Sequence, residues 1–165
     1  MIPLLLNNYL FQQQARAMME DKQMHQYPFF SRIGAFSVNL ENTRNMAFSL
    51  RYAHESMQRA NSSLYLYPEG KIVPFSTDQP EFRGGLAWLY NKMPDIDFVP
   101  IGIYIHTMRH DKPELHINIG EAVSYTGEPG SKAEIQDYLE KALQKLLNEL
   151  QLQSGFNNSE FVNWL

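Results

Sequence analysis

Apolar residues recur at helical spacing in two long segments of the chain. The first predicts a helix over residues 43–60, with Asn42 placed to cap its start. The second follows Ser131, which forms a capping-box pattern with Glu134 ahead of an amphipathic run of about 20 residues. Both segments therefore predict surface helices that bury one face.

Shorter elements lie before and between these two helices. Helices are predicted over residues 3–13, 20–27 and 84–93, and strands over 34–39, 63–67, 97–105 and 115–120. Residues 16–19 fit either a short strand, which we favour, or the end of the first helix. Pro100 lies inside one of these strands, which indicates an edge position, a bulge or the first residues of the strand. Because strands alternate with helices, the pattern predicts an α/β fold, a single domain with a largely parallel central sheet flanked by helices.

Composition narrows the classes of function. The 165 residues include no cysteine, which excludes disulfides, thiolate metal sites and a cysteine nucleophile. A formal net charge of -4 disfavours a nucleic-acid partner. No apolar run approaches the roughly 20 residues that cross a bilayer, and residues 1–6 lack the basic flank of a signal peptide. We expect a cytoplasmic protein that is either soluble or peripheral on the inner face of a membrane.

The segment Tyr67-Pro68-Glu69-Gly70 directly follows a predicted buried strand. In open α/β sheets, binding groups collect beyond the carboxyl ends of the strands. Glu69 is therefore a candidate binding residue, and Gly70 suits a turn or a close approach of backbone. The alternative is a tight turn that carries one solvated acid.

Four segments together resemble the sequence blocks of the lysophospholipid acyltransferases, the relatives of 1-acylglycerol-3-phosphate acyltransferase. Residues 67–70 and 98–103, "YPEG" and "FVPIGI", are similar to the third and fourth blocks of that family. Residues 18–38 resemble the second block, and residues 82–89, "FRGGLAWL", match the helix start that follows the Pro-Glu-Gly loop. The resemblance covers residues 2–123.

The resemblance implies a fold like that of glycerol-3-phosphate acyltransferase and transfer of a fatty acyl group to a lipid hydroxyl. The donor would be acyl-CoA or acyl-carrier protein as co-substrate, with no other cofactor and no metal. The partners would be the lipid acceptor, the acyl donor and a membrane surface, and the oligomeric state stays open. The substrate-binding residues implied are Tyr67, Pro68, Glu69, Gly70, Lys71, Arg83 and Arg32.

The family's catalytic His-x-x-x-x-Asp dyad, in which the histidine acts as general base, has no counterpart ahead of the second block. His106 and Asp111 have the required spacing but follow the fourth block, so we do not assign them as the dyad. We expect an acyltransferase-like domain over residues 1–152 that is incomplete at its N-terminus, followed by a tail over 153–165. Either the dyad precedes Met1 in a longer protein, or the protein is a natural relative without a base; the chain by itself is predicted to be inactive.

Family members that use a phosphate acceptor carry an arginine after the second-block strand and another beside the Pro-Glu-Gly loop. Here these places hold Asn39-Leu40 and Lys71-Ile72, so a glycolipid or another lysophospholipid fits at least as well as lysophosphatidate. Tyr27, Phe29 and Phe30 could line an acyl groove, contact a membrane or pack in the core. The alternatives to an acyltransferase domain are a non-catalytic lipid- or CoA-binding module and, more distantly, a thioester hydrolase.

Overall fold

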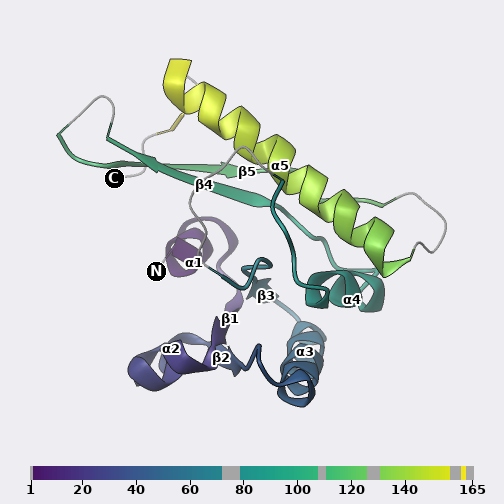
Figure 1. The fold of residues 1–165 in the computed structure, drawn as a ribbon. Helices are drawn as coiled ribbons and strands as arrows, with labels where there is room; N and C mark the ends of the chain where they lie inside the picture. The colour runs from purple at the N-terminus through teal and green to yellow at the C-terminus, as the bar shows by residue number, and fades with distance from the viewer. Residues whose placement is uncertain (1, 72–78, 108–110, 126–130, 157–160, 163–165) are drawn as a thin grey trace. The chain divides into compact units, whose positions relative to one another are not determined.

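The computed structural model describes residues 2–71, 79–107, 111–125, 131–156 and 161–162. The chain forms two compact units, an N-terminal unit of residues 1–72 and a C-terminal unit of residues 73–165. Each has its own sheet, and Figure 1 labels the helices and strands of both. The expected single domain over residues 1–152 stays a prediction.

The N-terminal unit is built on a three-stranded parallel sheet in the order β2-β1-β3. The strands are β1 (Gln14–Glu20), β2 (Ala35–Val38) and β3 (Ser62–Tyr65). The central strand β1 pairs with β2 from Ala17 onwards and with β3 over its first half. Because the strands are parallel, their carboxyl ends point the same way. β1 and β2 end at the paired residues Glu20 and Val38, and β3 ends at Tyr65, opposite Ala17.

The helices of this unit connect its strands. Short helices α2 (Asp21–Gln26) and η2 (Pro28–Ile33) link β1 to β2, and α3 (Thr43–Met57) links β2 to β3 while contacting all three strands. Asn42 caps α3 as predicted, since its side chain accepts hydrogen bonds from the backbone N–H groups of Arg44 and Asn45. The predicted strands and helices of this unit are therefore confirmed apart from the first helix.

The helix predicted over residues 3–13 is present over residues 2–11, but its second half is π-helical rather than α-helical. The structure has a short α-helix, α1 (Ile2–Leu6), followed by a π-helical turn, η1 (Asn7–Phe11), and then β1 from Gln14. Asn7 ties the end of this helix to the following chain, because its buried side chain accepts a hydrogen bond from the N–H of Gln13 and donates one to the Gln13 carbonyl. A side chain that bonds local backbone in this way competes with a continuing α-helix.

The C-terminal unit consists of an antiparallel strand pair and two helices. The strands β4 (Ile101–His106) and β5 (Glu114–Ile119) pair from Ile101 opposite Ile119 to His106 opposite Glu114. The helices are α4 (Gly85–Lys92) and α5 (Lys132–Phe156), and α5 runs along the strand pair (Figure 1). Pro100 comes directly before β4, in line with the expectation that it marks the first residues of a strand.

Burial in the C-terminal unit centres on α5. Phe82, Ala87, Ile135 and Leu139 form a buried cluster between α5 and the segment that carries α4. At the other end of α5, Leu150 is fully buried. Its side chain packs on Gly102 of β4, because a Cβ added to Gly102 would lie 3.3 Å from the Cδ2 atom of Leu150. Leucines of α5 thus pack directly on the backbone of β4. The predicted capping box at the start of α5 is confirmed by reciprocal bonds between Ser131 and Glu134.

The coarse fold prediction is confirmed, because the molecule is mixed α/β with a small parallel sheet flanked by helices. The expectation of a largely parallel sheet holds for β1, β2 and β3, whereas β4 and β5 form a separate antiparallel pair.

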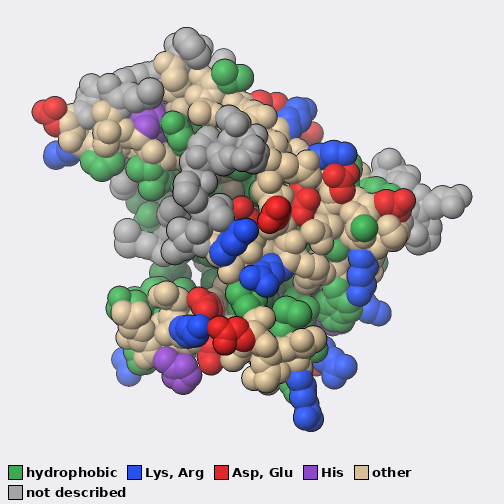
Figure 2. Space-filling model, in the orientation of Figure 1, with side chains coloured by type: hydrophobic (Ala, Val, Ile, Leu, Met, Phe, Trp, Pro, Cys, Tyr) green, Lys and Arg blue, Asp and Glu red, His purple; other side chains and the backbone are tan. Residues whose placement is uncertain are grey.

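None of the described helices is long and apolar enough to cross a membrane. On the face drawn in Figure 2, the described Lys and Arg side chains are interspersed with Asp and Glu side chains.

Candidate functional site

The predicted binding segment forms a turn just beyond the carboxyl end of β3. The N–H of Gly70 donates a hydrogen bond of 3.1 Å to the carbonyl of Tyr67, which closes a four-residue turn. Pro68 and Gly70 occupy the second and fourth positions of this turn, where proline and glycine are favoured. Gly70 has a φ of 63°, a left-handed conformation that glycine adopts without a steric penalty. The turn places Glu69 beside the sheet edge where ligands of α/β folds bind.

Glu69 is half-buried in this turn. Burial raises the pKa of its carboxyl above the ordinary value of 4.5, and the nearby charge of Lys71 partly opposes that rise. The Glu69 carboxyl is thus less exposed to solvent than the carboxyl of an acid in a simple surface turn. A partly desolvated carboxylate forms stronger hydrogen bonds with a ligand hydroxyl than one in bulk water.

The other predicted binding residues lie in different environments. Tyr67 is 59% exposed, and Pro68 is half-buried beside it. Lys71 is exposed directly after the turn, and Arg32 is exposed in the last turn of η2. All four belong to the N-terminal unit with Glu69 and Gly70.

Arg83 belongs to the C-terminal unit. It is exposed, and its carbonyl accepts a hydrogen bond from the N–H of Leu86 at the start of α4. The expected basic residue at a helix start is therefore present. Its role beside Glu69 stays a prediction.

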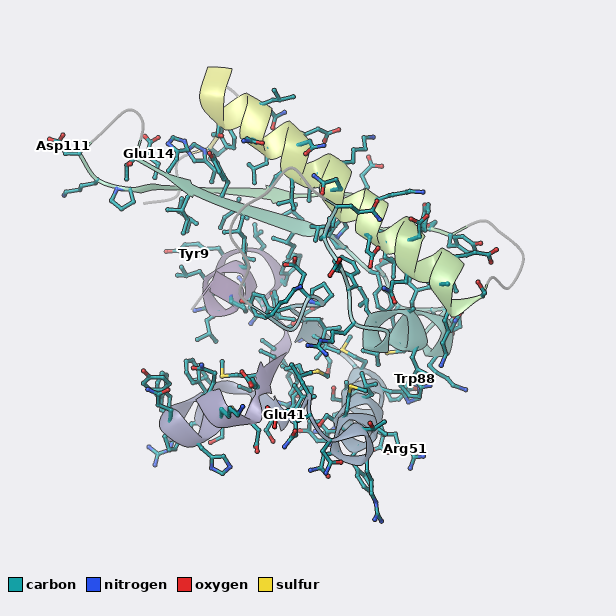
Figure 3. The ribbon with its side chains drawn as sticks, viewed as in Figure 1. Tyr9, Glu41, Arg51, Trp88, Asp111 and Glu114 are labelled. Carbon is teal, nitrogen blue, oxygen red and sulfur yellow. The ribbon has the colours of Figure 1, made fainter. Side chains whose placement is uncertain are left out.

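A second group of chemically capable side chains lies in the C-terminal unit, on β4 and β5. The carboxylate beside His106 belongs to Glu114, whose Oε2 atom is 3.7 Å from the Nε2 atom of His106. The same oxygen is 3.5 Å from Nε2 of His116. Asp111, the spacing partner of His106 in the sequence, is exposed, and Figure 3 shows it at the outer end of the β4–β5 connection, away from Glu114.

Strand register brings these three side chains together. His106 is paired directly with Glu114, and His116 follows Glu114 by two residues, so all three point to one face of the strand pair. Gly102 lies on the same face, towards α5. The imidazole rings of His106 and His116 stack with centroids 4.6 Å apart and planes 15° from parallel.

This group, the His–Glu–His cluster (His106, Glu114 and His116), is well shielded from solvent. The side chains of the two histidines are only 5% and 8% exposed, and that of Glu114 is 23% exposed. The ring of Phe161 packs edge-on against His116 at a centroid distance of 4.7 Å. Burying polar side chains is costly unless they find partners or bind a ligand, so this shielded cluster is a candidate functional site.

This cluster is not apparent from the sequence alone, although part of its signal is visible there. Glu114 and His116 are two residues apart in or beside a predicted strand, which places both on one face. His106 could be added only by knowing that the preceding strand pairs antiparallel with this one. A search for fixed motifs does not provide that register.

Comparisons with models of protein families, with curated proteins and with solved structures found no match for this chain. The functional conclusions below therefore depend on the residues and their geometry.

Proposed function

We propose that the N-terminal unit binds a hydroxyl-bearing lipid acceptor, as the acceptor part of a domain related to the lysophospholipid acyltransferases. The observation that carries this proposal is the half-buried Glu69, held by the Tyr67–Gly70 turn at the carboxyl edge of a parallel sheet. The proposed fold of the whole domain is that of glycerol-3-phosphate acyltransferase. Support for both comes from the ordered sequence blocks together with the position of this turn.

Glu69 would accept hydrogen bonds from the hydroxyl groups of the acceptor. A carboxylate is an acceptor-only group at neutral pH, so it suits a polyol head group and repels a phosphate. Lys71 provides one cation beside it, without the planar fork with which arginine binds phosphate. The proposed acceptor is therefore a glycolipid or a hydroxyl-rich lysolipid rather than lysophosphatidate.

The aromatic residues at the start of η2 offer an apolar surface for the acceptor's chain or for a lipid interface. Tyr27 and Phe29 are 44% and 54% exposed, and the ring of Phe29 stacks on that of Phe30 at 4.2 Å. Exposed, mutually packed aromatic rings are typical of surfaces that contact lipid head groups. These residues belong to the same unit as Glu69.

The test is calorimetric titration of the full chain with octyl glucoside below its critical micelle concentration, and with lysophosphatidate as the phosphate-bearing comparison. We expect the glucoside to bind and Glu69→Gln to weaken its binding about tenfold or more, because hydrogen bonds to a charged group contribute about 1.5–3 kcal/mol. Affinity should also fall as the pH falls through the raised pKa of Glu69, because the protonated carboxyl loses acceptor capacity.

Glu55→Gln is the matched control, since Glu55 is an exposed residue of α3 in the same unit. It should leave glucoside binding unchanged. Equal binding by wild type and Glu69→Gln, or no binding of the glucoside by the wild type, would show that the proposed acceptor site is wrong.

A further inference from the structure

We infer that the His–Glu–His cluster is a binding site for a divalent first-row transition-metal ion, with Zn²⁺ as its simplest occupant. The site goes beyond the proposed acceptor function and uses residues of the C-terminal unit alone. It is the group of three potential ligands found among the described residues, with one donor atom from each within 4.8 Å of the others.

The distances between the donor atoms fit a shared ion better than direct hydrogen bonds. The carboxylate oxygen of Glu114 is 3.7 Å from Nε2 of His106 and 3.5 Å from Nε2 of His116. A charge-assisted hydrogen bond would bring these atoms to about 2.7–2.9 Å. Ligand atoms at about 2.0–2.2 Å from a tetrahedral Zn²⁺ are separated from each other by about 3.3–3.5 Å.

One of the two stacked imidazoles offers a buried ring nitrogen as a donor to a metal ion. Neutral histidine is the form that coordinates a metal ion. The buried Nε2 atom of His116 also forms no hydrogen bond within the described part of the chain, so it can coordinate without losing one. Because the rings are 15° from parallel, rotation about their χ2 torsions is needed to direct both Nε2 atoms at one ion.

The ligand set selects the class of ion. Two imidazoles and one carboxylate suit Zn²⁺, Fe²⁺ or Co²⁺, whereas Ca²⁺ and Mg²⁺ prefer oxygen ligands. Three protein ligands leave a fourth position for water or a ligand atom, the arrangement of catalytic rather than closed structural zinc sites. Paired β-strands hold all three ligands at fixed register, and the edge-on ring of Phe161 restricts solvent at His116.

The experiment titrates the metal-free full chain with Zn²⁺ by calorimetry and with Co²⁺ by visible absorption. We expect one ion per chain with micromolar affinity or tighter, and d–d absorption bands of the intensity typical of four- or five-coordinate Co²⁺. His116→Ala and Glu114→Gln should each weaken Zn²⁺ binding at least tenfold. Glu114→Gln keeps the shape of the side chain, so it tests the ligand even if the alanine variant unfolds.

His25→Ala is the control, because His25 is an exposed residue of α2 outside the cluster. It should bind Zn²⁺ as the wild type does. Zn²⁺ should also raise the midpoint of thermal unfolding for wild type and His25→Ala, and much less for Glu114→Gln, since a ligand that binds only the folded state stabilises it. Failure of the wild type to bind one ion, or binding unaffected by Glu114→Gln in a folded protein, would overturn the inference.

Discussion

Gly34 shows how one residue can limit the packing of a whole sheet. It joins η2 to β2 with a φ of 92°, and its carbonyl accepts a hydrogen bond from the N–H of Ala17 in the central strand. A Cβ at this position would collide with the carbonyl oxygen of Ala15. The backbone conformation and the neighbouring strand therefore both require glycine here.

We predict that Gly34→Ala destabilises the protein by at least about 1–3 kcal/mol, the cost of holding a non-glycine residue in a disfavoured backbone region. The clash with β1 adds to this cost. The measurement is urea-induced unfolding, in which the midpoint should fall. Ser37→Ala, an exposed position on β2, should change the free energy of unfolding by less than about 0.5 kcal/mol. Equal stability of Gly34→Ala and Ser37→Ala would contradict the account of this junction.

Local chemistry made several single residues predictable from the sequence. The Asn42 cap of α3 and the Ser131–Glu134 capping box of α5 could both be predicted, because each depends on residues within one helical turn. The turn at Gly70 was predictable for the same reason. The burial of Glu69 and the meeting of His106 with His116 depend on distant parts of the chain, and residue types alone do not report that proximity.

At the level of elements, α5 stabilises the C-terminal unit through one face. Leu150 on that face is fully buried and lies over β4, whereas Leu152 of the same helix is 62% exposed. The two leucines form a matched pair, because they differ in burial but share a helix and a chemical type.

We predict that Leu150→Ala lowers the free energy of unfolding by about 2–5 kcal/mol, from lost burial and the cavity left against β4. Leu152→Ala should change it by less than about 0.5 kcal/mol, because it removes an exposed side chain and alanine favours helix. Chemical denaturation followed by circular dichroism measures both. Similar losses in the two variants would show that α5 does not pack through the Leu150 face.

The pairing of β4 with β5 was foreseeable from the sequence in one respect. Only residues 107–113 connect the two strands, fewer than the dozen or so that a parallel crossover needs. The alternation of helices and strands nevertheless led to the expectation of a largely parallel sheet. The start of β4 at Ile101 rather than residue 97 follows from its partner, since β5 ends at Ile119, opposite Ile101. Register between strands decides such boundaries, and apolar periodicity does not contain it.

For the molecule as a whole, the division into two compact units separates the two candidate sites. The acceptor turn at Glu69 belongs to residues 1–72, and the His–Glu–His cluster belongs to residues 73–165. The residues that carry each proposal belong to one unit, so each proposal can be tested by variants that leave the other unit's sequence unchanged. Loss of lipid binding and loss of metal binding are therefore distinguishable outcomes.

The last prediction concerns chemistry by the full chain. We expect incubation with acyl-CoA and a lysophospholipid or alkyl glucoside, in the presence of EDTA, to release free CoA no faster than buffer does. The physical reason is the lack of a His-x-x-x-x-Asp dyad ahead of the second block, because a positioned general base contributes about 10²–10⁴-fold to such a reaction. A thiol-reactive dye measures the CoA released.

His106→Ala identifies the source of any activity that does appear. His106 is the histidine with an aspartate at the dyad spacing in the sequence, but the carboxylate beside it in the structure is that of Glu114. The side chains of His106 and Glu114 are both largely buried. CoA release above the buffer rate that disappears in His106→Ala, while His25→Ala keeps it, would make His106 a general base oriented by Glu114. Release that persists in His106→Ala would require a base elsewhere in the chain. Either result would contradict the proposal that this chain binds an acceptor without transferring an acyl group.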